Sequence, residues 1–488
     1  MRQVKLDTVF EGVKLVKVLG NFDRDIENIK FDSRVVDQRS AFVAVQGTNV
    51  DGHDYIEAAI ENKCSLIVVE KLPKELKNKI TYIMVEDSAK ALALMACNFY
   101  DNPSRKLRLT GVTGTNGKTT IVTLLKNLFD DLGYKTGKLS TIENVIVDEV
   151  IPSTHTTPDP VSLNELLDKM VIKGCDFAFM EVSSHAIDQD RVTGLRFEGG
   201  IFSNISHDHL GYHGTMKEYI RVKKLFFDHL DKEAFALYNA DDRRGNVMVQ
   251  NTNARKFSFA FKDLADFKGK LIENSLRGLW LKFNGNEFHS RLIGRFNAEN
   301  LLAIYACGIL LGLEEIELLT ALSKLKSAKG RFEYILREED QVVGIVDYAH
   351  TPDALEKVLE TINKTKTKTS KVITVFGCGG DRDKTKRPKM ARIGYQLSHQ
   401  LILTTDNPRT EDPNAILLDM ENGLDLNEKR SVLSIPDRKQ AIRTACKMAN
   451  RGDVILVAGK GHENYQEVDG VRTPFDDKEV LKEELGII

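Results

Sequence analysis

The segment that most constrains this chain is an apolar strand that leads through a glycine-rich loop into a helix. The strand is LRLTGV, the helix is IVTLLKNLFDDLG, and the loop between them consists of Gly114, Thr115, Asn116, Gly117, Lys118, Thr119 and Thr120. In such a loop, backbone N–H groups face phosphate oxygens, the helix N-terminus and a lysine add positive charge, and a hydroxyl can reach Mg²⁺. Val112 stands where the usual pattern has its first glycine. We therefore predict a variant phosphate-binding loop.

Length and composition predict a protein of several domains that has no global preference for polyanions. The chain has 488 residues, which is enough for about three domains of ordinary size. Because 69 basic and 71 acidic residues leave a net charge of −2, nothing favours nucleic acid or a membrane surface. The six cysteines form no CxxC pair, which favours buried free thiols over zinc or disulfides. The N-terminus MRQVKLDTVFEG lacks an apolar secretion signal, so we expect a cytoplasmic protein.

Alternating strand and helix patterns predict three α/β units. Residues 1–105 form the first and smallest, in which FVAVQG and SLIVVE are buried strands and YIEAAIEN is a helix. Residues 106–333 hold the phosphate loop on a doubly wound parallel sheet, because FAFMEVSS and GIFSNIS are apolar strands that end in polar residues. Residues 334–488 repeat strand and helix patterns and predict a Rossmann-like sheet. Residues 252–293 carry little recognisable pattern.

Two polar clusters follow the strands of the central unit. Glu181 ends the strand FAFME, where a carboxylate could bind Mg²⁺, a hard cation that prefers oxygen ligands. The segment NISHDHLGYHG holds His207, Asp208, His209 and His213. No cysteine or distant HxxxH pair completes a zinc set, so a histidine that shares Mg²⁺ beside phosphates fits better. Lys223 follows among other basic residues that, from the residues alone, form the solvated face of a helix.

Together these segments resemble the Mur ligases over nearly the whole chain. The similarity lies, in family order, in GTNGKTT, THTTPD, EVSSHA, NISHDHLGYHG, GRFNAEN, GRFE, DYAHTPDALE, GCGGDRDKTKRPKM, DNPRTEDP and GKGHENYQ. The resemblance implies three domains that bind a UDP-sugar, ATP and an incoming amino acid during peptidoglycan synthesis. It also implies a reaction in which ATP phosphorylates a carboxylate and an amine attacks the acyl-phosphate, with cations neutralising the transferring phosphoryl group.

The resemblance assigns roles around ATP and the metal. Lys118 matches the lysine that holds the β- and γ-phosphates, and Thr119, Glu181 and His209 match ligands of Mg²⁺. Lys223 matches the lysine that this family carbamylates with CO₂, which would turn a cation into a further metal-binding anion. The remaining ATP contacts implied are Asn297 at the adenine, Arg331 at the hinge, and Asp347, Tyr348 and His350 from the third domain.

The resemblance also points to both other substrates. Residues that match contacts of UDP-N-acetylmuramoyl-L-alanyl-D-glutamate are Ser33, Thr156, Thr157, Ser183, Gln189 and Arg191. The DNPR motif is similar to that of members that add meso-2,6-diaminopimelate, whose extra carboxylate an arginine can hold bidentately. The matching pocket residues are Arg382, Asp406, Asn407, Arg409, Gly459 and Glu463.

Several alternatives stay open at this point. L-Lysine or lanthionine could replace diaminopimelate as the acceptor. A folylpolyglutamate-synthase-like ligase would share the ATP machinery, although the large N-terminal unit and DNPR argue against it. An NTP-driven switch would use the phosphate loop without forming an amide. We expect a monomer that binds ATP and Mg²⁺.

Overall fold

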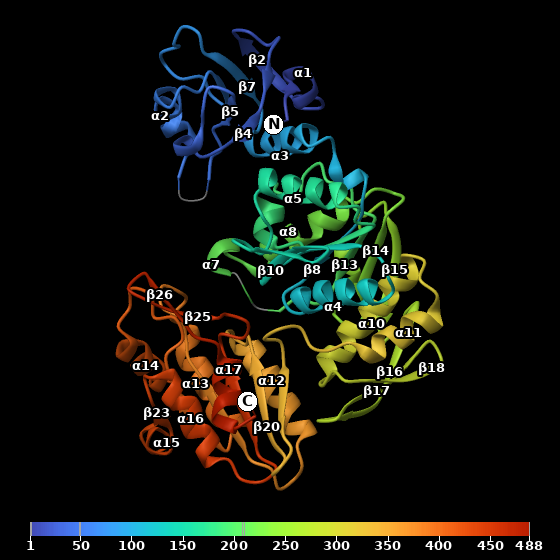
Figure 1. The fold of residues 1–488 in the computed structure, drawn as a ribbon, viewed down its shortest axis with the longest axis vertical. Helices are drawn as coiled ribbons and strands as arrows, with labels where there is room; N and C mark the ends of the chain where they lie inside the picture. Colours follow the sequence, from blue (N-terminus) through green and yellow to red (C-terminus); the bar gives the residue numbers. More distant parts are fainter. Residues whose placement is uncertain (1, 48–49, 207, 209, 488) are drawn as a thin grey trace.

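The three predicted units are stacked along the long axis of the molecule (Figure 1). This computed structural model describes residues 2–47, 50–206, 208 and 210–487. The N-terminal unit lies at one end, the central unit in the middle and the C-terminal unit at the other end. Each large sheet takes its strands from one predicted unit, except that β19 (Glu333–Arg337) begins at the last residue assigned to the second unit. The three-unit α/β architecture is confirmed, and the boundaries at 105–106 and 333–334 remain a prediction.

The N-terminal unit is built on a five-stranded sheet. Its strand order is β2 (Leu15–Leu19), β7 (Thr81–Val85), β6 (Leu66–Val69), β5 (Ser40–Val43), β4 (Asn28–Lys30), and only β2 is antiparallel to its neighbour. A small ladder of β1 (Val4–Lys5) and β3 (Asp25–Ile26) adjoins it, with helices α1 (Leu6–Val9), α2 (Ile56–Glu61) and α3 (Ser88–Phe99). The expected strands and helix are β5, β6 and α2. Helix α3 also packs against α5 (Pro160–Ile172) of the central unit, which joins the two units.

The central unit has an eleven-stranded sheet whose middle is parallel. The order is β11 (Glu149–Pro152), β10 (Glu143–Ile146), β9 (Thr136–Leu139), β12 (Phe177–Glu181), β8 (Arg108–Thr113), β13 (Gly199–Phe202), β14 (Phe235–Asn239), β15 (Arg255–Ala260), β16 (Phe267–Ser275), β17 (Gly278–Phe283), β18 (Asn286–Ser290). One apolar layer joins the sheet to α4 (Lys118–Asp131), α10 (Arg295–Leu310) and α11 (Glu315–Lys324). The other layer joins it to α5 (Pro160–Ile172), α8 (Met216–Asp228) and α9 (Gly245–Met248).

The segment without a recognisable pattern forms the far edge of this sheet. Strand β15 and the start of β16 continue the parallel order, and β16, β17 and β18 then form an antiparallel meander. A second antiparallel hairpin, β10–β11, closes the opposite edge, so the sheet is mixed and not parallel throughout. Asn284 and Gly285, both at positive φ, form the Asn-Gly turn between β17 and β18, a hairpin signal present in the sequence.

The C-terminal unit is a second doubly wound sheet. Its order is β19, β20 (Val342–Asp347), β24 (Val454–Ala458), β21 (Val372–Phe376), β22 (Gln400–Leu403), β23 (Leu433–Ser434), and only β19 is antiparallel. Helices α12 (Pro352–Thr365), α13 (Lys386–Leu397) and α14 (Pro413–Glu421) cover one face. Helices α16 (Arg438–Met448) and α17 (Asp477–Leu485) cover the other, while α15 (Leu426–Ser431) and the hairpin β25 (Tyr465–Val468)–β26 (Val471–Pro474) lie outside the sheet.

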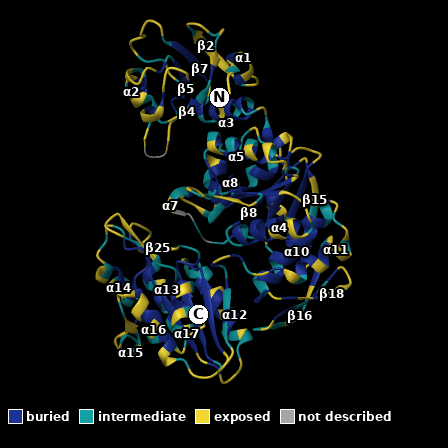
Figure 2. Ribbon diagram, viewed as in Figure 1, coloured by how far each residue is buried: buried dark blue, intermediate teal, exposed yellow. Residues whose placement is uncertain are grey.

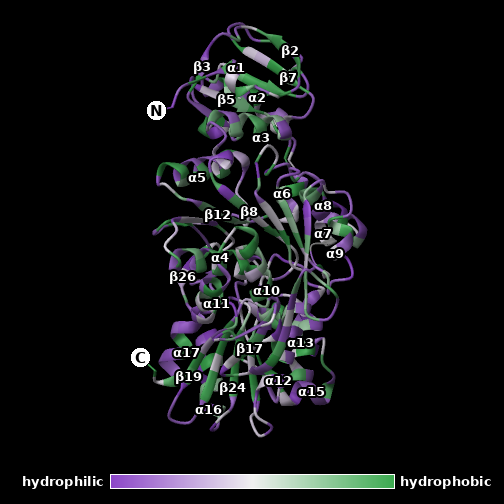
Figure 3. Ribbon diagram, turned by 90° about the vertical axis from the view of Figure 1, so that its right-hand side faces the viewer, coloured by the Kyte–Doolittle hydropathy of each residue, from purple (hydrophilic) through white to green (hydrophobic). Residues whose placement is uncertain are grey.

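Burial follows the layers that the sequence pattern predicts. The sheet strands are mostly dark blue in Figure 2 and largely apolar in Figure 3, whereas exposed and hydrophilic residues gather on loops and outer helix faces. All six cysteines are buried with free thiols, as predicted from their spacing. Across the described residues, no helix is long and apolar enough to cross a membrane.

Candidate functional site

A cleft of about 1140 Å³ lies between the central unit and the C-terminal unit. Parallel strands place their carboxyl ends at one edge of a sheet, and here the loops after β8, β12, β20, β22 and β24 open into the same space. Residues from the phosphate loop lie at one part of this cleft, and residues of DNPR and GKGHE lie at another. The cleft therefore brings together most of the residues singled out in the sequence.

The phosphate loop has the backbone geometry that anion binding needs. Gly117 caps α4 at φ 89°, and a Cβ there would lie 2.6 Å from Asn300 Oδ1, so only glycine fits. Because glycine has no side chain, it does not cap the first N–H groups of the fourteen-residue helix α4. Those groups and the positive end of the helix dipole meet the cleft.

Two lysine ammonium groups converge on one carbonyl oxygen of this loop. Lys118 Nζ lies 2.9 Å from Gly114 O and 2.8 Å from Thr115 O, and Lys223 Nζ lies 2.9 Å from Gly114 O. Burial lowers the pKa of Lys118, and burial together with the charge of Lys118 lowers the pKa of Lys223 well below its usual range. Lys223 is 1% exposed, so it does not lie on the solvated helix face that its neighbours suggest.

Glu181 faces this positive cluster from the end of β12. It is 1% exposed, and its carboxylate accepts hydrogen bonds from Thr141 N at 2.8 Å and Thr141 Oγ1 at 3.2 Å. Within the described chain it forms no ion pair, so its oxygens retain room for a cation. Thr119 lies in the same cleft and accepts a bond of 3.3 Å from Arg331 Nη2. A buried carboxylate beside a hydroxyl is an oxygen donor set that fits Mg²⁺.

The histidine-rich segment is only partly described. His207 and His209 lie outside the described residues, so the predicted metal role of His209 stays a prediction. Asp208 lines the cleft, whereas His213 Nε2 lies 2.9 Å from Ser184 Oγ and is buried against α6 (Ser184–Asp188). Among the residues that are described, no three histidine, cysteine or acidic side chains group as metal ligands.

The residues matched to the UDP-linked dipeptide form a network along α6. Thr157 Oγ1 donates to Glu181 O at 2.8 Å, and Arg191 Nη1 donates to Thr157 O at 2.9 Å. Gln189 Oε1 accepts from both Nε and Nη2 of Arg191, and Ser183 Oγ caps α6. The cleft is lined by four of these residues, Thr156, Thr157, Ser183 and Arg191. Gln189 bonds to Arg191 but does not line the cleft itself.

Ser33 lies apart from this network. It begins a short 3₁₀ helix (Ser33–Val35) in the N-terminal unit, is 6% exposed, and its carbonyl accepts a bond from Asn62 Nδ2. It does not line the cleft, so a ligand that reached both would have to span two units. An extended UDP-sugar with a peptide arm has that form.

The C-terminal unit contributes a second set of predicted ATP contacts. Asp347 accepts a bond from Phe332 N, and burial raises its pKa to about 6. His350 is exposed to the cleft, where desolvation by the surrounding atoms and the charge of Lys386 lower the pKa of its imidazole. The guanidinium of Arg331 stacks on the ring of Tyr348 at 4.6 Å.

Asn297 is a predicted ATP contact that does not line the cleft. It is 3% exposed, and its Nδ2 donates to Ile293 O at 2.8 Å. Asn300, one helical turn further on, lines the cleft beside Gly117. The role of Asn297 at the adenine stays a prediction. Asn300 lines the cleft but was not predicted from the sequence.

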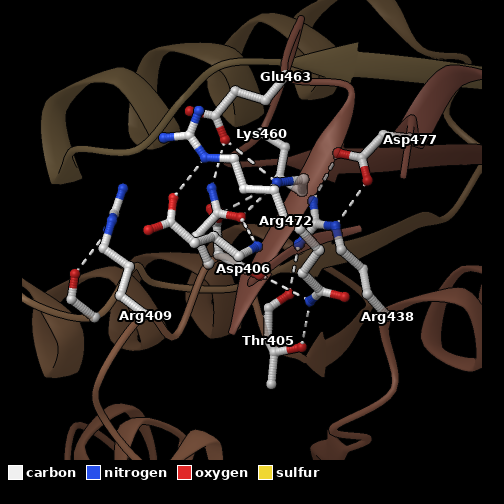
Figure 4. Close-up of polar contacts among 12 residues, drawn as sticks. Thr405, Asp406, Arg409, Arg438, Lys460, Glu463, Arg472 and Asp477 are labelled. Carbon is white, nitrogen blue, oxygen red and sulfur yellow. Dashed lines mark hydrogen bonds and ion pairs between the residues drawn. The ribbon is translucent and has the colours of Figure 1, made fainter. Parts of the chain in front are cut away.

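The acceptor residues cluster where the loops after β22 and β24 meet (Figure 4). Asn407 Nδ2 donates to Glu463 Oε2 at 2.7 Å, and a Cβ on Gly459 would lie 2.7 Å from Asp406 Oδ2. Arg409 adopts a left-handed φ of 52°, and its Nη1 donates to Gly380 O at 2.7 Å. Arg382 also lines the cleft. Their roles toward an acceptor stay predictions.

Two further residues complete the geometry and were not predicted. Asp353 Oδ2 accepts bonds of 3.0 Å from Asn116 Nδ2 and from Ser206 Oγ, which ties the C-terminal unit to the phosphate loop. Lys460 is fully buried between Asp406 and Glu463. Both residues stand inside recognised segments, DYAHTPDALE and GKGHENYQ, but Asn116, Ser206 and Asp406, which they contact, lie far away in the sequence.

Comparisons with known proteins define the class to which this site belongs. Family models match the Mur ligase family catalytic domain at residues 25–100, the Mur ligase middle domain at 112–308, and the Mur ligase glutamate ligase domain at 330–461. The chain belongs to the Mur ligase family, which confirms the resemblance seen in the sequence.

Individual relatives are similar over the full length. The UDP-N-acetylmuramoyl-L-alanyl-D-glutamate–2,6-diaminopimelate ligase of Cytophaga hutchinsonii is 54% identical over 100% of this chain and 99% of its own. That of Bacteroides fragilis is 52% identical over 98% and 99%. A solved structure of such a ligase, 31% identical, covers 99% of both chains with a TM-score of 0.71. The MurF ligase of Thermotoga maritima in complex with ADP, 19% identical, shares the fold with a TM-score of 0.61.

Proposed function

We propose that this chain is an ATP-dependent ligase that adds meso-2,6-diaminopimelate to UDP-N-acetylmuramoyl-L-alanyl-D-glutamate during peptidoglycan synthesis. The observation that carries the proposal is a single cleft with the phosphate loop in one part and Arg409, Asn407 and Glu463 in another. Such a cleft can hold ATP, a carboxylate and an amine together. Full-length identity of 54% to a ligase with this substrate pair supports the choice of substrates.

The geometry supports chemistry by way of an acyl-phosphate. A carboxylate is a poor electrophile, and transfer of the γ-phosphoryl group converts one of its oxygens into a leaving group. Lys118 and the N-terminus of α4 would stabilise the charge on the phosphates during that transfer. The acceptor amine then attacks the carbonyl carbon, and the tetrahedral adduct collapses to an amide and inorganic phosphate. The contact of Asp353 with Asn116 would keep water away from the acyl-phosphate by closing the units.

We further propose that Thr119, Glu181, His209 and a carbamylated Lys223 hold Mg²⁺, which would supply positive charge at the transferring phosphoryl group. The lowered pKa of Lys223 favours the neutral amine, the form that adds CO₂. The resulting carbamate would place a negative charge beside the ammonium group of Lys118 at Gly114 O.

We also propose that the enzyme works as a monomer in the cytoplasm. The cleft of a single chain contains residues assigned to each of the three substrates, and six buried free thiols suit a reducing compartment. Light scattering on the purified enzyme should give the mass of one chain, and a stable dimer would contradict this part.

The acceptor panel is the decisive experiment. Phosphate release is measured with ATP, Mg²⁺ and UDP-N-acetylmuramoyl-L-alanyl-D-glutamate, with meso-diaminopimelate, L-lysine or lanthionine as acceptor. We expect release only when a nucleotide-sugar and diaminopimelate are both present. Equal turnover with L-lysine or lanthionine would overturn the acceptor, and turnover of a folate with glutamate would overturn the pathway. Hydrolysis of ATP that is independent of both substrates would favour a nucleotide-driven switch.

A further inference from the structure

A fully buried lysine lies among the acceptor residues of the cleft. Lys460 has a side chain that is 0% exposed, and its Nζ lies 3.1 Å from Asn407 Oδ1, 3.3 Å from Glu463 Oε2 and 3.8 Å from Asp406 Oδ1. Figure 4 shows this ammonium between the side chains of the two loops. Lys460 does not line the cleft, so it touches the residues that would meet an acceptor, and not the acceptor itself.

Glu463 needs a neighbouring positive charge to remain an anion. Burial raises its pKa, and the negative charge of Asp406 raises it further. The charge and hydrogen bond of Lys460 lower the pKa, and so does the hydrogen bond from Asn407. A protonated Glu463 would have no charge with which to attract an ammonium group.

A second fully buried cation, Arg438, pairs with another carboxylate. Arg438 donates through Nε and Nη2 to the two carboxylate oxygens of Asp477, at 2.7 Å each, and both side chains are fully buried. Its Nη1 and Nη2 also donate to Thr405 O and Ala458 O. This pair therefore ties the ends of β22 and β24 together (Figure 4), and the charge of Arg438 acts more on Asp477 than on Asp406 and Glu463.

The other titratable and charged groups around the pocket have contacts of their own. Arg472 pairs with Glu467 and stacks on Tyr465, whose pKa burial raises. Burial lowers the pKa of His462 to about 3, so it is neutral at pH 7. Arg409 uses one of its donors on Gly380 O, and Arg331 lies over the ring of Tyr348.

We propose that Lys460 is a positioning residue that keeps Glu463 ionised and held by Asn407, so that Glu463 can receive the second ammonium group of a diamino acceptor. This inference rests on the proposed function, because it assumes an acceptor with an amine beyond the one that reacts. Lys460 thereby converts a buried carboxylate pair into a site with one net negative charge.

The test is the pH profile of kcat/KM for meso-diaminopimelate in the full-length enzyme. In Lys460→Gln, which keeps a donor for Asn407 but loses the charge, the acidic limb should move up by about one pH unit. A shift of that size makes the acceptor KM about tenfold higher than that of the wild type at pH values below both limbs, and the difference should vanish at pH values above both, with the KM for ATP unchanged. A loss of equal size at every pH, or an unmoved limb, would overturn the proposal.

Two further variants keep the result interpretable. Glu463→Gln should lack the acidic limb whether or not the Lys460 variant folds, and a wild-type limb in that protein would overturn the proposal. Lys126→Gln removes another buried lysine, paired with Asp130 at the far end of α4, and should keep the wild-type profile. Wild-type enzyme that does not use diaminopimelate would instead sink the proposed function, before any variant is compared.

Discussion

At the phosphate-loop end of the cleft, Lys118 and Lys223 share one carbonyl oxygen, whereas at the acceptor end Lys460 lies between two carboxylates. Neither of the first two ammonium groups forms an ion pair within the described residues. Burial lowers the pKa of both, and like charge adds to the effect for Lys223. The two ends thus contain the same side chain in opposite electrostatic settings.

The opposite electrostatic settings indicate which kind of ligand each end of the cleft favours. Unneutralised positive charge raises the free energy of the folded protein until an anion arrives, so that end favours a polyphosphate. The acceptor end already contains its own counter-charges and favours a ligand that carries both signs, such as a diamino diacid. Variants that alter one end should therefore affect one substrate and spare the other.

The largest effect is expected from removal of the loop lysine. Lys118→Met keeps the apolar stem but removes the charge that faces the phosphates, and kcat should fall by about 10³-fold. The acceptor KM should change little, because Lys118 belongs to the other end of the cleft. Steady-state kinetics with each substrate varied in turn measures both values. A loss below tenfold would show that the backbone N–H groups and metal suffice without this lysine.

A smaller loss is expected when Lys223 can no longer become a carbamate. Lys223→Arg keeps a positive charge, cannot add CO₂, and should reduce kcat by about 10²-fold. Wild-type activity should also fall in CO₂-depleted buffer and return with bicarbonate, because the lowered pKa leaves the amine neutral and reactive. Lys224→Arg is the matched control, since that neighbour pairs with Asp228 on the same helix. Full activity of the Lys223 variant would exclude the carbamate.

Arg409 tests the acceptor end directly. Arg409→Lys replaces a planar fork by a point charge, so the KM for meso-diaminopimelate should rise about tenfold with little change in kcat. Any residual use of L-lysine should be unaffected, because L-lysine lacks the second carboxylate. Arg451→Lys, on an exposed turn, serves as control. An equal loss with both acceptors would assign Arg409 to loop structure, consistent with its bond to Gly380 O.

The contrast between the ends also explains what could be predicted from sequence. The phosphate loop is a local feature, because strand, glycines and lysine are contiguous, and β8 and α4 appear where expected. The role of Lys460 depends on Asn407, which is 53 residues away, and no local pattern reveals that contact. The basic neighbours of Lys223 predict that it lies on the solvated face of a helix. Only the family resemblance indicates a role for it in the site. The burial of Asn297 depends on how α10 packs, which helical spacing alone did not resolve.

The smallest effect is expected from a change at Glu411, whose ion pair with Arg387 supports the loops that contain the acceptor residues. Arg387, fully buried, bonds Glu411 through two nitrogens and Gly379 O through one, and it lowers the pKa of Glu411 to about 2. A lowered carboxyl pKa stabilises the fold above the unfolded value, and that stability is lost as pH falls toward 2.

Glu411→Gln should therefore reduce the Tm at pH 7 by a few degrees, since Asp419 still pairs with Arg387 and solvent screens the partly exposed Glu411, which limits the loss to about 1 kcal/mol. The difference from wild type should shrink as pH falls below about 4.5, where the unfolded glutamate becomes protonated. Thermal unfolding followed by circular dichroism at several pH values measures the gap. Because Glu411 also accepts from Asp381 N, the acceptor KM should rise slightly while the ATP KM stays constant. A Tm difference between the two proteins that is independent of pH would mean that Glu411 acts through packing and not through its charge. It would contradict the view that ion pairs organise the acceptor end of the cleft.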